Sequence, residues 1–300
     1  MQVPRGNRQW LRGLLQIKGS VIPAIWPRVL LCSAFGTLVS WLYMLGAPIS
    51  KPGIGNIVPT LVLGLLLVFR TNTAYDRFWE GRKTWGGIIN TSRNIARQIW
   101  VFVEEQTPQN RVEKQAILRL VVAFAISTKL HLRGESVNDE LEGLLSPAQY
   151  EKLKTMNHPP LEVVVWINDY LHAQHQRGCL HIYQVSAIVE LLNKLVDSLG
   201  SCERILKTPL PAAYSIHLAQ LLLIYCLILP FQLVADLGWL TGLSIGLISF
   251  TLLGIEEIGL EIENPFGRDP NDLPLDTICS TMQRNIEDLM LLDPSIPQVD

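Results

Sequence analysis

A group of histidines near the middle of the chain is the first candidate for chemistry. His172 and His175 stand three residues apart, and Cys179 and His181 follow closely. Imidazole and thiolate groups are common ligands of zinc and other transition metals. The first two histidines can share one helix face, but Gly178 interrupts the pattern and no carboxylate is placed to complete a site. A membrane-bound metalloenzyme that uses His172, His175 and His181 stays open beside the simpler interpretation of surface histidines between helices.

An acidic stretch offers a second kind of site. Residues 256–272 combine several carboxylates with an Asx-proline turn at Asn264 and Pro265. Hard oxygen donors of this kind suit Ca²⁺. The spacing is not that of an EF-hand, however. A capped helix exit whose acids pair with nearby arginines would explain the same residues.

A third pattern is apolar. Leu61, Leu65 and Phe69 recur at positions i, i+4 and i+8, so they stack along one face of a helix. If several copies of this helix surround an axis, these side chains form successive hydrophobic collars, which can gate a pore by dewetting. Leucines at this spacing also occur in ordinary buried packing. A dense polar and aromatic junction, residues 70–82, follows directly.

The elements that must position these residues belong to a chain built for two solvents. Only 17% of the residues are charged, below the roughly 25% of soluble domains. The stretches 29–50, 57–69 and 237–255 contain no Lys, Arg, Asp or Glu, whereas residues 70–207 are as charged as a soluble protein. The formal net charge of −2 gives no basic face for nucleic acid.

Four segments are candidates to span a membrane. A bilayer core needs about 20 apolar residues in a helix. The shortest candidate, Ile57–Phe69, follows the turn Lys51–Asn56 and is expected to form a hairpin with the segment before it. Its brevity is typical of a segment that faces other protein or a pore. The four predicted spans are Val29–Ile49, Ile57–Phe69, Leu218–Ala235 and Leu237–Ile255.

Basic residues at the span ends predict the orientation. Residues 1–28 contain five Lys or Arg side chains and no acid, and the second span runs into Arg70, Arg77 and Arg82. Such residues favour the cytoplasmic side, so both termini and the central region are expected there or in a stroma. Trp10 and Trp26 indicate that the first segment lies along the membrane interface as an amphipathic helix.

These observations predict an all-α protein with two transmembrane hairpins and a cytosolic helical bundle between them. Pro108, Pro147, the Pro159–Pro160 pair and Gly178 divide the central region into several helices. Gly242 and Gly246 form a small-residue pattern suited to close helix packing. The expected segments are 1–28 (interfacial helix), 29–83 (first hairpin with the pore-lining helix), 84–212 (cytosolic helices), 213–258 (second hairpin) and 259–300 (acidic cytosolic segment).

Two motifs give the chain a recognisable signature. The junction begins Phe69-Arg70-Thr71-Asn72 and continues through Tyr75, Arg77 and Phe78 to Glu80-Gly81-Arg82 and Trp85. The second motif is the turn Asn264-Pro265-Phe266-Gly267 with the acids after it. Together with the order of the elements, they resemble the bestrophin family, in its prokaryotic or plastid type. The resemblance covers about residues 10–290.

The resemblance implies a homopentameric ion channel, a ring of subunits with the pore on its five-fold axis. It assigns Leu61, Leu65 and Phe69 to the pore neck. It places a second, cytosolic aperture near the start of the helix after Gly178, at Ile182 or Tyr183.

The family's calcium clasp carries over in part. Asn264, Asp269 and Asp272 match its ligands, while Glu261 stands where the animal channels have a glutamine. A bound Ca²⁺ would also need a backbone carbonyl from the N-terminal segment of a neighbouring subunit. Prokaryotic members can lack calcium dependence, so Ca²⁺ is expected only as an optional cofactor.

The function expected from the sequence is passive conduction of small monovalent anions such as chloride, nitrate or bicarbonate, without enzymatic activity. A collar without fixed charge does not set the sign of the ion, so a monovalent cation channel of the same architecture stays open. A non-conducting scaffold that docks partners on residues 84–212 is a further alternative. The expected partners are further copies of the chain, membrane lipid and small ions. The expected location is a bacterial inner membrane or a thylakoid membrane.

Overall fold

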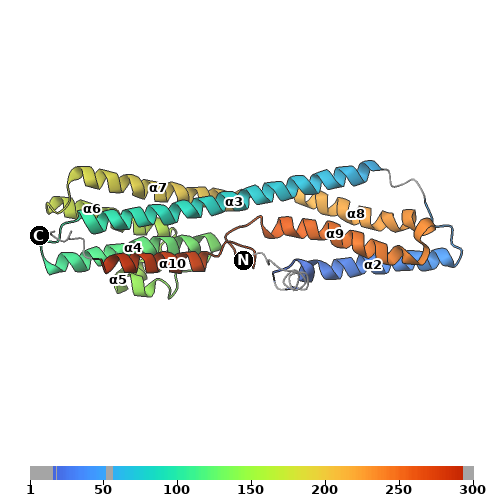
Figure 1. Ribbon diagram of the computed structural model, residues 1–300, viewed down its shortest axis with the longest axis horizontal. Coiled ribbons are helices and arrows are strands. Elements are labelled where there is room, and N and C mark those ends of the chain that lie inside the picture. Colours follow the sequence, from blue (N-terminus) through green and yellow to red (C-terminus); the bar gives the residue numbers. More distant parts are fainter. Residues whose placement is uncertain (1–15, 18, 52–56, 293–300) are drawn as a thin grey trace, which may run out of the picture. The chain divides into compact units, whose positions relative to one another are not determined.

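The computed structural model describes residues 16–17, 19–51 and 57–292, and every regular element in these ranges is a helix (Figure 1). This confirms the predicted all-α class. The elements in chain order are α2 (Ile22–Met44), α3 (Ile57–Phe102), α4 (Pro108–Arg133), η1 (Glu142–Leu144), α5 (Pro147–Thr155), α6 (Pro159–Gln176), α7 (Ile182–Lys207), α8 (Ala212–Leu237), η2 (Gly238–Leu240), α9 (Thr241–Glu261) and α10 (Leu275–Met290).

The chain forms two compact units. The first contains residues 1–78, 209–264 and 268–272, and the second contains residues 79–208, 265–267 and 273–300. Helix α3 belongs to both, because it continues unbroken through the boundary expected at residue 83. Most of the predicted interfacial helix, including Trp10, lies outside the described residues, and α2 begins at Ile22 rather than at Val29.

Proline and glycine set many of the helix boundaries, as the sequence predicts. Pro108, Pro147 and Pro159 each occupy the first turn of a helix, where the missing N–H costs no hydrogen bond. Gly134 ends α4 with a φ of 66°, a left-handed conformation that glycine adopts without strain. Gly178 has a φ of 76° in the turn between α6 and α7. Local chemistry therefore determines where these helices begin and end.

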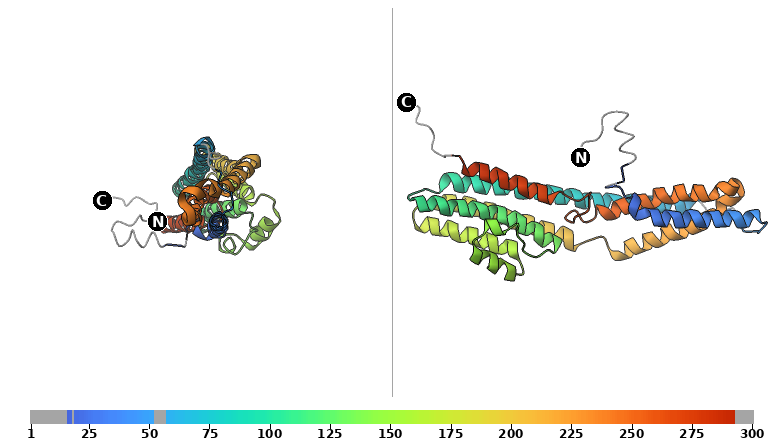
Figure 2. Two further views of the ribbon diagram at one scale, coloured as in Figure 1. Left: turned by 90° about the vertical axis from the view of Figure 1, so that its right-hand side faces the viewer. Right: turned by 90° about the horizontal axis from the view of Figure 1, so that it is seen from below.

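In the first unit, α2 packs closely along α9 (Figure 2). A Cβ atom added at Gly242 would overlap the Thr37 side-chain oxygen and would lie 3.0 Å from the Thr37 backbone nitrogen. One added at Gly246 would meet the Ser33 hydroxyl at 3.2 Å. The Ser33 hydroxyl donates a hydrogen bond of 2.9 Å to the Gly242 carbonyl. The predicted small-residue pattern thus lies at a helix interface, where it allows two backbones to approach.

Length and hydropathy select spans that differ in part from the four predicted ones. Among the described helices, α2 and the run Ala212–Glu261, which contains α8 and α9, are long and apolar enough to cross a membrane, and most of their residues are not buried within the chain. Helix α3 is not among the spans selected from the described residues. The prediction that Ile57–Phe69 forms a span therefore rests on its place in the chain.

Helix α4 also passes the hydropathy criterion, yet it is a core helix of the second unit. Of its most apolar window, 78% is buried inside the protein. Its buried lysines are paired: Lys114 contacts Glu105 at 2.8 Å, and Lys129 contacts Glu140 at 2.5 Å and Asp276 at 2.7 Å. A helix that is apolar on every side is covered either by lipid or by protein, and here protein covers it.

The acid that closes this network is on α10. Partial burial favours the neutral form of Asp276, but hydrogen bonds from Arg133 and Lys129 outweigh that effect and lower its pKa to about 2. Asp276 therefore stays ionised at neutral pH and compensates the fully buried Lys129. The interior of this helical bundle therefore holds a paired charge, contributed by α4, α10 and the loop at Glu140.

The close contact between α2 and α9 can be tested with glycine substitutions. We expect Gly242→Ala to destabilise the protein by about 1–3 kcal/mol, because the new methyl group overlaps the backbone and side chain of Thr37. The matched control is Gly254→Ala in the same helix, whose methyl group would lie 3.7 Å from Ile25, an ordinary contact. Thermal unfolding in detergent measures both variants. Equal unfolding midpoints for Gly242→Ala and Gly254→Ala would contradict the close packing of α2 against α9.

Candidate functional site

The face of α3 that carries Leu61, Leu65 and Phe69 is not covered by the described residues. These side chains are 62%, 50% and 62% exposed. The opposite face is buried, with Leu63 at 4% and Leu67 at 2%. Exposed rows of large apolar side chains are uncommon on proteins that act alone in water. This row therefore faces lipid, another chain or a passage.

The buried face of α3 explains how the row is held. Leu63 and Leu67 form a cluster with Leu218 and Leu222 of α8. The Tyr214 hydroxyl, also from α8, donates a hydrogen bond of 2.7 Å to the carbonyl of Leu66 on α3. Since α8 holds one side of α3 along the whole predicted neck, the row of Leu61, Leu65 and Phe69 points away from α8 as a fixed ridge.

Directly after Phe69, the arginine of the junction is buried. Arg70 is 1% exposed, and its guanidinium lies 3.6 Å from a carboxylate oxygen of Glu263. The other carboxylate oxygen of Glu263 accepts a hydrogen bond of 2.9 Å from the backbone N–H of Leu210. Its backbone carbonyl accepts one of 3.1 Å from Arg77. Glu263 thus joins α3, the link before α8 and the end of α9. Acids of the stretch 256–272 thus pair with arginines, as predicted by the alternative of a capped helix exit.

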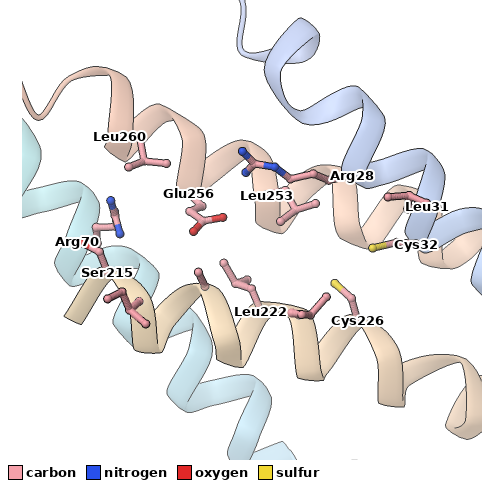
Figure 3. A pocket seen from close by; sticks show the side chains of 13 residues that line it. Arg28, Leu31, Cys32, Arg70, Ser215, Leu222, Cys226, Leu253, Glu256 and Leu260 are labelled. Atoms are coloured by element: carbon pink, nitrogen blue, oxygen red, sulfur yellow. The ribbon is translucent and has the colours of Figure 1, made fainter. Parts of the chain in front are cut away.

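A cavity of about 560 Å³ lies beside this pair (Figure 3). Most of its walls are apolar, from α2, α8 and α9, but Arg28, Arg70 and Glu256 also line it. Figure 3 shows the carboxyl group of Glu256 pointing into the space between the helices, with Arg70 at the same end. Arg28 is itself 3.3 Å from Glu257, so the charged end of the cavity contains both signs.

The four predicted calcium ligands lie in and after the end of α9. One carboxylate oxygen of Glu261 accepts a hydrogen bond of 2.6 Å from the side-chain amide of Asn271. A carboxylate oxygen of Asp272 accepts one of 2.8 Å from the backbone N–H of Asp269. Asn271 also donates at 3.3 Å to the carbonyl of Gly19, in the N-terminal segment of the same chain.

The three carboxylates among these predicted ligands do not converge on one point. Calcium takes about six to eight oxygen ligands around a common centre. Within the described part of the chain, Glu261, Asp269 and Asp272 do not form a set whose carboxylate oxygens all lie within 4.8 Å of one another. The loop instead uses its acids to cap its own backbone and Asn271. The geometry does not fit a calcium centre in this chain alone, and calcium binding stays a prediction from the resemblance.

The predicted cytosolic aperture lies at the first turn of α7. Ile182 and Tyr183 are both exposed. His181 caps this helix, because its ring nitrogen accepts a hydrogen bond of 3.4 Å from the backbone N–H of Tyr183. No contact among the described residues decides between Ile182 and Tyr183, so the aperture stays a prediction.

The structure does not support the histidine cluster proposed as a metalloenzyme site. His172 pairs with Gln176 at 2.9 Å, the ring of His175 contacts the carbonyl of Leu180 at 3.0 Å, and His181 caps α7. In the described ranges, no set of three metal-ligating groups forms from these histidines. Proximity in the sequence was misleading, because each histidine satisfies a nearby helix end or helix neighbour.

The fold brings together a different set of metal-ligating groups, His131, His158 and Glu203. These residues come from α4, the cap of α6 and α7. Sequence spacing does not indicate this set, because His158 follows His131 by 27 residues and Glu203 follows His158 by 45 residues. Only the packing of the second unit reveals it.

The two motifs that carry the family resemblance meet in the second unit. A Cβ atom added at Gly81 would lie 2.9 Å from the Pro265 ring and 3.2 Å from the Phe266 ring. Phe266 is fully buried, and Arg133 donates hydrogen bonds of 3.2 Å to the carbonyls of Phe266 and Gly267. The glycine of the first motif is therefore needed for the second motif to pack against it.

Comparison with known proteins agrees with this signature. The model of the bacterial/fungal bestrophin protein family matches residues 1–288. The chain belongs to the bestrophin family. A bestrophin relative from Nostoc sp. is 63% identical over 98% of this chain and 96% of its own length. Another from Escherichia coli is 31% identical over 94% of this chain and 91% of its own length. Both are named voltage-dependent anion channel-forming proteins.

Solved structures show the same fold. A crystal structure of a point mutant of a bacterial bestrophin homolog from Klebsiella pneumoniae is 28% identical in sequence, with a TM-score of 0.81. It is matched over 89% of this chain and 99% of its own chain. Bestrophin membership makes this chain an ion-channel protein of the membrane, and not an enzyme.

The buried pair of Arg70 and Glu263 is the most testable part of the site. We expect Arg70→Met to destabilise the protein by about 3 kcal/mol, because Glu263 is left buried without its partner. The double variant Arg70→Met with Glu263→Gln should recover part of that loss, since no charge is then left uncompensated. Thermal unfolding in detergent gives the comparison.

Arg28→Gln is the matched control. Its guanidinium, on α2, is exposed and pairs with Glu257 of α9, and an exposed pair contributes about 0–1 kcal/mol. If Arg70→Met were no more harmful than Arg28→Gln, the buried pair would not hold α3 in place.

Proposed function

We propose that the protein is a homopentameric channel that conducts small monovalent anions, chloride above all, passively down their gradient. The observation that carries the proposal is the bare ridge of Leu61, Leu65 and Phe69 on a helix whose other face is packed. Five copies of α3 around an axis would convert this ridge into three consecutive apolar rings. Such a neck binds ions weakly, so ions pass quickly once it is wet, and it can close by dewetting.

Self-assembly is supported by the remaining apolar surface. Leu31 on α2 and Leu243 and Leu247 on α9 are exposed within this chain. Side chains of this kind in segments apolar enough to span a membrane are stable against lipid or against neighbouring subunits. The basic residues near the span ends support a cytosolic or stromal location for both termini. The membrane itself would be a bacterial inner membrane or a thylakoid membrane.

The proposal that the conducted ion is an anion rests on the names of the relatives and on the aromatic ring of Phe69. The matched relatives are named for anion channels. Phe69 can direct its ring edge, the positive part of its quadrupole, toward a passing anion. The exposed carboxylates of Asp76 and Asp269 favour the second candidate, a monovalent cation channel of the same architecture. Nitrate and bicarbonate are further anions of suitable charge.

Reconstitution into a planar bilayer under a KCl gradient separates these candidates. We expect single-channel currents whose reversal potential lies close to the equilibrium potential of chloride, because anions carry most of the charge. A reversal potential close to that of potassium would assign the channel to cations. Absence of current from intact, assembled protein would contradict the channel proposal altogether.

The neck assignment has its own test. We expect Leu65→Ala to raise the single-channel conductance or the open probability about twofold or more, because a smaller side chain widens the ring and lowers the cost of wetting it. Leu66→Ala is the matched control, since Leu66 is on the same helix but packs against the cluster formed with α8 and is not on the ridge. Unchanged currents in Leu65→Ala would remove this residue from the pore.

A further inference from the structure

Two imidazoles and one carboxylate converge inside the second unit. His131 lies in the last turn of α4, His158 is the residue before α6, and Glu203 lies in α7. The Nε2 atom of His131 is 2.6 Å from one carboxylate oxygen of Glu203, and the Nε2 atom of His158 is 3.0 Å from the same oxygen. The two rings are 4.5 Å apart at their centres.

The cluster is sheltered but reachable. The side chains of His131, His158 and Glu203 are 22%, 36% and 19% exposed. A cavity of about 240 Å³ reaches His131 and the two residues that flank His158, Asn157 and Pro159. This cavity has room for water or a small ligand beside His131.

The donor set is that of a zinc site with an open position. Two histidines and one glutamate bind Zn²⁺ in several hydrolytic enzymes, and the fourth position is left to water. Metal bonds of about 2.1 Å in a tetrahedral arrangement place ligand atoms about 3.4 Å apart. The observed separations of 2.6 and 3.0 Å need to widen by less than about 1 Å, which a small rotation of the exposed end of each side chain supplies.

We propose that His131, His158 and Glu203 bind a divalent transition-metal ion of the zinc class, with the fourth position open to water. Both Nε2 atoms are directed at one Glu203 oxygen, to which each can donate its N–H, so an ion that replaces these hydrogens would enter between the three groups. Each histidine then carries its proton on Nδ1. The ion ties α4, α6 and α7 together, which stabilises the second unit in proportion to its occupancy.

The surroundings indicate reversible binding rather than a permanent structural ion. The Nδ1 atom of His158 is buried and has no hydrogen-bond partner among the described residues. Histidine ligands normally donate this second N–H to an acceptor, and loss of that contact weakens metal affinity about 10–100-fold. Lys207 lies 3.9 Å from Glu203 and competes for the carboxylate. The site is therefore expected to exchange its metal with solution.

Zinc titration of the full chain tests the proposal. The purified channel is first stripped with a chelator, and binding of ZnCl₂ is then followed by calorimetry and by the thermal unfolding midpoint. We expect one saturable site per chain and a midpoint that rises by several degrees. Co²⁺ should show the visible absorption of a tetrahedral nitrogen and oxygen site.

The variants must separate this site from the other histidines. Glu203→Gln and His158→Ala should each weaken zinc binding at least tenfold and abolish the rise in the midpoint. His172→Ala is the matched control, because His172 is exposed and pairs only with Gln176 among the described contacts; it should bind zinc like the parent.

His158 precedes α6 and is partly exposed, so its replacement is expected to leave the fold intact. If Glu203→Gln fails to fold, zinc binding by His158→Ala therefore tests the proposed site. Absence of a saturable site in the parent, or equal binding by parent and His158→Ala, would show a hydrogen-bonded cluster only and overturn the proposal. Currents in the planar bilayer are independent of this result, because the site lies outside the predicted neck.

Discussion

The buried charge of Arg70 constrains the first unit more than any other single group. A guanidinium that is removed from water is stable only beside a carboxylate, and Glu263 is the acid that reaches it. Glu263 is held in turn by Leu210 and Arg77. The end of the apolar part of α3, the entry to α8 and the exit of α9 therefore meet at one place. The ridge of the proposed neck, Leu61 to Phe69, ends one residue before this anchor.

The anchor matters because α3 serves two environments without a break. Its first part presents Leu61 and Leu65 on one face while α8 covers the other. Its later part buries Trp85, Ile88 and Ile95 in the second unit. A single helix of 46 residues can do both because its period is constant while the polarity of each face changes along it. A break near residue 70 would uncouple the ridge from the packed part of the helix.

The second unit shows how polar groups are used inside a helical bundle. Lys129 is fully buried because Glu140 and Asp276 both neutralise it, and Arg133 joins the same acid while holding the Phe266 turn. This network explains why a helix as apolar as α4 is not a membrane span. The two buried lysines of α4, Lys114 and Lys129, each have a carboxylate partner from outside that helix.

Much of the architecture was predictable from local patterns. The all-α class, the helix starts at Pro108, Pro147 and Pro159, and the close face at Gly242 follow from residue chemistry within one or two turns. The family signature was also visible, because its two motifs are short and contiguous. The spacing of Leu61, Leu65 and Phe69 identified a helix face, but the same spacing fits a buried face equally well.

The tertiary structure decided what depends on distant partners. It left the face of Leu61, Leu65 and Phe69 bare, because α8 packs against Leu63 and Leu67 instead. It separated His172, His175 and His181, and it joined three residues of different helices at Glu203. The physical reason is the same in each case. Sequence spacing determines which side chains share a face of one helix, whereas only packing determines which faces meet.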